Sequence, residues 1–153
     1  MKKIVENISI IHNNIFVLTP LLISFYKNYK GIKNDLLLSY LILPIVLNPK
    51  CIEELKVIRS NSNLARLVTN KECMAGFAER FEFYKQITNQ CIQYAIDCKY
   101  ITVTANLQIK VVNTDTYTDP SLSNSITLAS NLHNLFKSLD VINIYYAFGI
   151  KNL

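Results

Sequence analysis

The sequence predicts an α+β domain that is mainly helical, and three observations lead to this prediction. Over most of the chain, apolar residues recur at steps of three and four, which is the pattern of helices with one buried face. Between about 100 and 112 the step changes to two, which is typical of strands. The chain has 153 residues without an internal repeat or a linker, so we expect one domain over 1–153.

Two apolar segments open the chain. The first predicts a helix over Asn13–Lys30, in which Pro20 marks a kink or a late start. The second, Leu36–Leu47, reads LLLSYLILPIVL and is apolar nearly all round. A core strand is the alternative, but the length and the leucine content favour a buried helix bent at Pro44. Neither segment reaches the about 20 apolar residues that a membrane-spanning helix needs.

The middle of the chain predicts three helices. Pro49 suits the first turn of a helix near Cys51–Arg59, and a short helix is expected over Asn63–Val68. The longest helix, Lys71–Lys99, is expected to start at a capping box formed by Thr69 and Glu72. Its apolar stripe predicts one continuous buried face, made of Met74, Phe77, Phe81, Tyr84, Thr88, Cys91, Ala95 and Cys98.

A β-hairpin is expected over about 100–112, with Ala105 and Asn106 as a two-residue turn. A polar loop leads to C-terminal helices over about 125–149, the last beginning at Asp140 and ending at Gly149. A hairpin that follows a helical pair and a long helix is the winged-helix arrangement. The domain is therefore predicted to be winged-helix-like.

Four cysteines, Cys51, Cys73, Cys91 and Cys98, stand too far apart for a C-x-x-C pair. Zinc sites are typically built from ligands at short spacing, so we expect no bound metal. We expect all four to be reduced core residues of a cytoplasmic protein. Lys2, Lys3 and Glu6 open a segment too polar for a signal peptide, which agrees with that location.

Catalytic motifs are missing from the sequence. The three glycines are isolated, so no phosphate-binding loop is present, and no nucleophile or metalloprotease motif occurs. Glu79 and Glu82 share a helix face, but such a pair is far more often a solvated charged face than an acid/base pair. We therefore predict that the chain is not an enzyme and uses no cofactor.

Lysines make the chain basic, with 16 Lys and Arg against 11 Asp and Glu and a net charge of +5. Lys27, Lys30 and Lys33 lie on both sides of Gly31, where the first helix is expected to end. Such a cluster is usually a solvated helix end that complements the helix dipole. The functional alternative is a patch that contacts DNA phosphates or a partner, with Lys50 as a fourth candidate.

Several segments resemble the middle components of three-component ABC-ATPase systems. Leu41–Leu47, LILPIVL, is similar to an LVLPLVLH segment of that family. Gly76–Arg80, Leu132–Phe136 and Ile144–Ile150 continue the resemblance in the same order. Each segment is short and apolar, and it is their order along nearly the whole chain that makes the resemblance specific.

The resemblance implies a non-enzymatic accessory subunit that bridges an SMC- or Rad50-like ATPase and an effector, often a nuclease. Lamassu-type bacterial defence against phages and plasmids is the implied setting. DNA would then be bound mainly through the complex, and a membrane would not be among the partners. The alternative is a free-standing winged-helix DNA-binding regulator. Against it, the long helix carries Glu72, Glu79 and Glu82, which do not suit a helix in the major groove.

Overall fold

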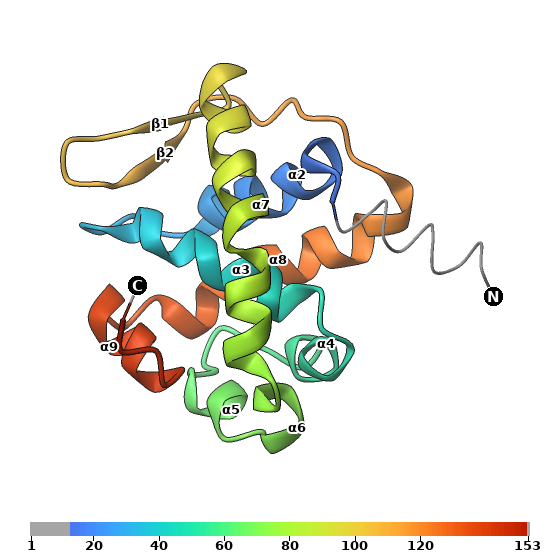
Figure 1. Ribbon diagram of the computed structural model, residues 1–153, viewed down its shortest axis with the longest axis vertical. Helices are drawn as coiled ribbons and strands as arrows, with labels where there is room; N and C mark the ends of the chain where they lie inside the picture. The colour runs from blue at the N-terminus through green and yellow to red at the C-terminus, as the bar shows by residue number, and fades with distance from the viewer. Residues whose placement is uncertain (1–12, 153) are drawn as a thin grey trace.

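Helix α7 (Phe77–Asp97) runs along most of the long axis of the molecule, and elements before and after it in the sequence pack against it (Figure 1). The computed structural model describes residues 13–152, so Lys2, Lys3 and Glu6 lie outside the described residues. Within that range the chain is mainly helical with one hairpin, which confirms the predicted class. The elements are α2 (Ile15–Asn28), η1 (Asp35–Leu38), α3 (Ser39–Val46), α4 (Pro49–Leu55), α5 (Ala65–Val68), α6 (Lys71–Met74), α7, β1 (Ile101–Val103), β2 (Ile109–Val111), η2 (Pro120–Leu122), α8 (Ser123–Phe136) and α9 (Val141–Ala147).

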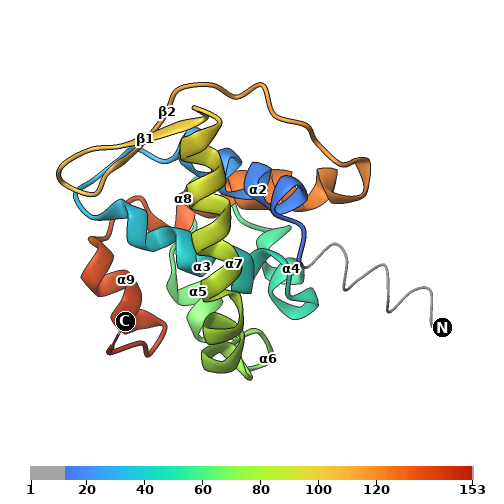
Figure 2. The same cartoon turned by 45° about the horizontal axis from the view of Figure 1, so that its top comes forward.

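The core lies where α2, α3, α7 and α8 meet, as both views show (Figures 1 and 2). Asn14 is the N-cap of helix α2, and its side chain accepts a hydrogen bond from the Phe16 amide at 3.0 Å. Pro20 lies inside α2 and is buried, and the helix continues past it to Asn28. The predicted first helix is thus confirmed.

The apolar stretch Leu36–Leu47 forms η1 and then α3. The side chains of α3 are buried almost completely, and Leu41, Ile42 and Leu43 are 0 % exposed. This confirms a buried helix and excludes the strand alternative. The first turn is a 3₁₀-helix, and the bend at Pro44 stays a prediction.

After α3 the chain turns by 105° into α4, whose N-cap is Asn48. Taken together, Asp35–Val46 and Pro49–Leu55 are long and apolar enough for a bent span by composition alone. Between residues 13 and 152, no single helix has the length and apolar character to cross a membrane.

The predicted continuous helix Lys71–Lys99 is wrong at its N-terminal end. Gly76 has a φ of +67°, in the left-handed region that glycine adopts readily, and it separates α6 from α7. The buried stripe from Phe77 to Ala95 is confirmed, but Met74 belongs to α6 and Cys98 is exposed beyond the end of α7.

The predicted capping box is also wrong. The Thr69 hydroxyl donates to the Ala65 carbonyl at 2.6 Å, back into α5, so it is not available to cap the next helix. Asn70 is the N-cap of α6 instead, and its side chain accepts from the Cys73 amide at 3.0 Å.

The hairpin is present, but its turn is longer than predicted. Ile101 pairs with Val111 and Val103 with Ile109, which leaves 104–108 between the strands in place of a two-residue turn. Leu107 has a φ of 54°, and its carbonyl accepts a hydrogen bond from the Leu36 amide at 3.0 Å. The turn therefore takes its shape from the segment on which it rests.

The C-terminal helices are confirmed as α8 and α9. The Asp140 side chain accepts from the Asn143 amide at 2.8 Å, and Gly149 has a φ of +74° just after α9. One side of α9 packs on η1 near the C-terminal end of the described chain. The winged-helix likeness of the whole arrangement stays a prediction.

Candidate interaction surfaces

The structure places three of the four candidate lysines on one short stretch. Lys27 lies in the last turn of α2, and Lys30 and Lys33 lie in the loop that leads to η1. All three are exposed, and no ion pair found within residues 13–152 involves them. Lys50 lies apart from them in α4, beyond the far end of α3 (Figure 1), and forms an ion pair with Glu72 at 3.1 Å.

Buried tyrosines hold this lysine stretch in place. Tyr29 is buried between Lys27 and Lys30, and its ring stacks on Phe25 with centroids 5.0 Å apart. The Tyr26 hydroxyl donates to the Asp35 carbonyl at 2.6 Å, which ties α2 to η1. The lysines thus project from an ordered helix end.

Asp35 anchors the second half of the stretch to the hairpin. Its carboxylate accepts hydrogen bonds from the Ile109 amide at 2.7 Å and from the Ile32 amide at 3.1 Å. The neighbouring Asn34 amide donates to the Asn106 carbonyl at 2.9 Å. The hairpin turn and the lysine loop therefore form one connected surface.

Asp35 is buried, whereas the three lysines of this stretch are exposed. Burial raises the pKa of this carboxyl group, and the two backbone amides that it accepts from oppose the shift. Its side chain is completely enclosed, so it serves the fold and leaves the outward charge of the lysines uncompensated at the surface.

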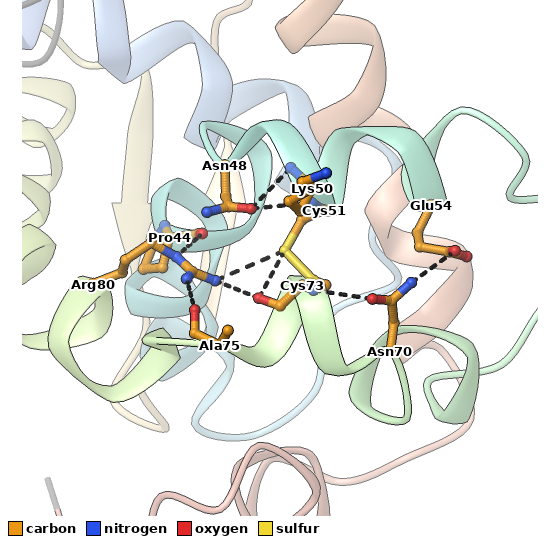
Figure 3. Close-up of a disulfide and its surroundings, with 9 residues drawn as sticks. All are labelled: Pro44, Asn48, Lys50, Cys51, Glu54, Asn70, Cys73, Ala75 and Arg80. Carbon is orange, nitrogen blue, oxygen red and sulfur yellow. Dashed lines mark hydrogen bonds between the residues drawn. A yellow bond between two sulfur atoms is a disulfide. The ribbon is translucent and has the colours of Figure 1, made fainter.

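A second polar centre joins α4 and α6. Cys51 and Cys73 form a disulfide, and both residues are fully buried (Figure 3). The expectation of four reduced core cysteines is therefore wrong for this pair, and Cys98 is exposed. The pairing depends on the 105° turn after α3, which brings α4 and α6 together. The spacing of the cysteines along the sequence does not reveal this turn.

Arg80 of α7 completes this centre. Its guanidinium donates to the carbonyls of Cys73 at 2.6 Å, Ala75 at 2.5 Å and Pro44 at 3.3 Å (Figure 3). These carbonyls lie at the ends of α6 and α3, where backbone acceptors lack helical partners and a cation is favoured. Partial burial lowers the pKa of Arg80, but an arginine stays charged in this setting.

The described residues offer no cluster of three or more His, Cys, Asp or Glu side chains that could hold a metal ion. Burial raises the pKa of the Cys91 thiol to about 11, so it is not a thiolate nucleophile at neutral pH. The His133 ring pairs through Nδ1 with the Ser130 carbonyl of its own helix.

Comparison with known proteins identifies the family. The family model described as "ABC-three component (ABC-3C) system Middle Component 3" matches residues 2–152. The chain belongs to this family. The match confirms the resemblance that the apolar segments indicate. No curated protein and no solved structure matches the chain.

Two residues that organise this middle component could not be assigned from sequence. Asp35 follows a short polar loop after Gly31, where acids are commonly exposed, and nothing in the pattern shows that the Ile109 amide of β2 binds it. Arg80 lies in the family-like segment Gly76–Arg80, which is one signal that its position matters. Its three carbonyl partners come from α3, α6 and the residue after α6.

Proposed function

We propose that this middle component is a non-enzymatic accessory subunit that bridges an SMC- or Rad50-like ATPase and an effector, often a nuclease. Its setting is bacterial defence against phages and plasmids, of the Lamassu type, in the cytoplasm. The family match over residues 2–152 supports this proposal. ATP hydrolysis and nucleic-acid cleavage belong to the other subunits.

The geometry suits a scaffold that holds partners in place. Arg80, the Cys51–Cys73 disulfide and Asp35 each connect elements that are distant in the sequence. Such cross-connections limit the relative motion of the helices. A subunit that bridges two partners needs this property, because a rigid body passes a displacement from one partner to the other.

The lysine stretch supplies a basic surface for DNA held by the complex. Lys27, Lys30 and Lys33 project from one ordered segment, so they can contact neighbouring phosphates of a backbone. Three cations release few counterions, and the chain alone is therefore a weak DNA binder. Lys50 pairs with Glu72 and adds to a protein contact more readily than to a DNA contact.

A free-standing winged-helix regulator is less well supported. The turn of the hairpin is bonded to the Asn34 and Leu36 amides, whereas a wing that enters a DNA groove needs a free tip. The outward face of α7 carries Glu79 and Glu82, which would repel phosphates. These observations favour a subunit over a DNA-reading module.

Co-expression with the other two components of the system tests the proposal. We expect a tag on this chain to recover the ATPase and the third component in fixed ratio. The recovered complex should hydrolyse ATP, and this chain purified by itself should not. Omitting the ATPase gene is the control. A chain that purifies alone from the full system, and binds one DNA sequence tightly, would contradict the proposal.

A further inference from the structure

Helix α9 is apolar on two sides, but only one side is covered. Val141, Ile144 and Tyr145 are buried against the body of the domain. Ile142 and Tyr146 are 66 % and 62 % exposed. They stand four positions apart, so they lie side by side on the outer face of the helix.

These two side chains border a groove between α9 and η1. The groove has a volume of about 160 Å³, and Leu37 and Ile150 contribute to its wall. A second hollow also has Leu37 in its lining, together with Tyr40 of α3. We call the apolar and aromatic side chains that line the two neighbouring hollows, namely Leu37, Tyr40, Ile142, Tyr146 and Ile150, the α9 surface.

Hydrogen bonds hold the α9 surface in shape. The Tyr145 hydroxyl donates to the Leu37 carbonyl, which fixes α9 on η1. The Tyr40 hydroxyl donates to Asn89 of α7 at 2.5 Å. The Ile150 amide donates to the Tyr145 carbonyl at 3.1 Å, so the chain folds back after α9 and carries Ile150 to the groove. A preformed groove loses little entropy when it binds a partner.

The charges around the α9 surface are basic. Among the described residues, Lys151 is the charged residue that lines the groove, and Lys85 is the charged residue that lines the hollow beside it. No carboxylate of residues 13–152 lines either of them. Lys85 is partly balanced by Glu82 at 2.9 Å, so among the described lining residues Lys151 is the charged group that forms no ion pair.

This charge pattern disfavours a second copy of the chain as the occupant. Two copies that meet through the same patch place each residue near the corresponding patch of its partner, so Lys151 and Lys85 would face lysines. A partner with carboxylates beside an apolar stripe meets both requirements of the surface. The four-residue spacing of Ile142 and Tyr146 suits the ridges and grooves of another helix.

We propose that the α9 surface binds an amphipathic helix of another component of the system, with apolar side chains in the groove and carboxylates near Lys151 and Lys85. This inference rests on the proposed function, because it requires a complex. It adds the contacting face and the chemistry of the segment bound there.

Variants of the assembled complex test this contact. Ile142→Glu and Tyr146→Glu place a negative charge opposite the acidic partner and remove apolar contact. We expect each to weaken recovery of one other component by about tenfold or more. Phe83→Glu is the matched control, because Phe83 is 65 % exposed on α7 and does not line the groove. Equal melting temperatures for the three variants would show that the fold is kept.

Photo-crosslinking identifies the occupant directly. A benzoylphenylalanine in place of Tyr146, in the co-expressed complex, should form its adduct with an acidic, apolar-striped helix of another component. An adduct with a second copy of this chain would overturn the inference, and so would full recovery of both components by Ile142→Glu. If the wild-type chain recovers neither component, the proposed function itself fails.

Discussion

Helix α3 and the neighbouring α4–α6 region are held in place by different interactions. Helix α3 is enclosed by other elements, and its apolar side chains hold it without a side-chain cap. Helices α4, α5 and α6 have only seven, four and four residues, and each buries one or two side chains. Helices this short are unstable alone. The disulfide, the two asparagine caps and Arg80 supply what burial does not.

The contrast shows how one chain can combine two sources of stability. A buried apolar side chain is stabilised by many weak contacts, so no single neighbour is essential, but a charge placed at its position is strongly unfavourable. A polar or covalent clamp depends on each of its members, because every lost partner leaves a buried group unsatisfied. Variants in the two regions should therefore fail in different ways.

The largest effect is expected in α3. Leu41→Asp places an unpaired carboxylate at a site that is 0 % exposed, and we expect a loss of about 4 kcal/mol or more in the free energy of unfolding. Urea unfolding measures it. Val57→Asp, at a residue 49 % exposed, should change stability by about 0.5 kcal/mol or less. A soluble Leu41→Asp protein with the wild-type melting temperature would disprove the burial of α3.

Loss of the disulfide should be the next largest effect, and it acts on α4–α6. Cys51 and Cys73 are separated by 22 positions, so their bond restrains the unfolded chain by about 3 kcal/mol. We expect refolding with a phosphine reductant to lower the urea midpoint. The Cys51→Ala/Cys73→Ala double variant should match the reduced protein and be insensitive to reductant. Equal urea midpoints with and without reductant would show that the disulfide does not stabilise the α4–α6 region.

Asp35→Ala tests how much the hydrogen bonds of one buried side chain beside α3 contribute to stability, compared with the disulfide in α4–α6. The substitution leaves the Ile109 and Ile32 amides without their acceptor, and we expect a cost of about 2 kcal/mol. Hydrogen exchange at the Ile109 amide should speed up before that of the α3 amides. Asp115→Ala, in an exposed loop, is the control and should have little effect.

The burial of Asp35 should also make the stability of the protein depend on pH. The pKa of Asp35 is raised in the folded state, so the folded protein binds this proton more tightly than the unfolded chain does. The stabilisation that comes from this tighter proton binding is fully present at pH values below the unfolded pKa, near 3.8. It is lost as the pH rises through the raised pKa of Asp35 in the folded state. We expect wild type to lose stability relative to Asp35→Asn over that window. A flat difference across it would contradict the shift.

The smallest effect on stability is expected at the lysines. The triple variant Lys27→Glu/Lys30→Glu/Lys33→Glu should unfold within about 0.5 kcal/mol of wild type, because all three are exposed. DNA binding by the assembled complex should weaken, and its salt slope should become shallower by about 3 or less. Lys56→Glu/Lys71→Glu/Lys99→Glu makes the same change in net charge elsewhere on the surface.

Two results for the lysine variant would change its interpretation. Affinities and salt slopes equal to wild type would leave the lysines as ordinary surface charge. Loss of assembly, with DNA binding by the remaining components unchanged, would move the patch from the DNA to the protein interface. Either result would leave the contrast between α3 and α4–α6 intact.

The sequence by itself determined the helical class, the buried α3, the hairpin and the family. The first three follow from local periodicity, because the spacing of apolar residues decides which face of an element avoids water. The family was indicated separately, by the resemblance of several apolar segments in the same order. The candidate lysines were likewise visible as a cluster around Gly31. The ordered backbone beneath them was not, because it depends on contacts with Tyr26, Asp35 and the hairpin.

Only the tertiary structure decided the Cys51–Cys73 pairing, the break at Gly76 and the longer hairpin turn. Each depends on groups that meet only after the chain has folded. The α3–α4 turn brings the cysteines together, Arg80 binds the carbonyls beside the break, and the Asn34 amide binds Asn106 in the turn. The spacing of apolar residues does not show which of these groups will meet, because their energy comes from polar and covalent contacts made in the tertiary structure.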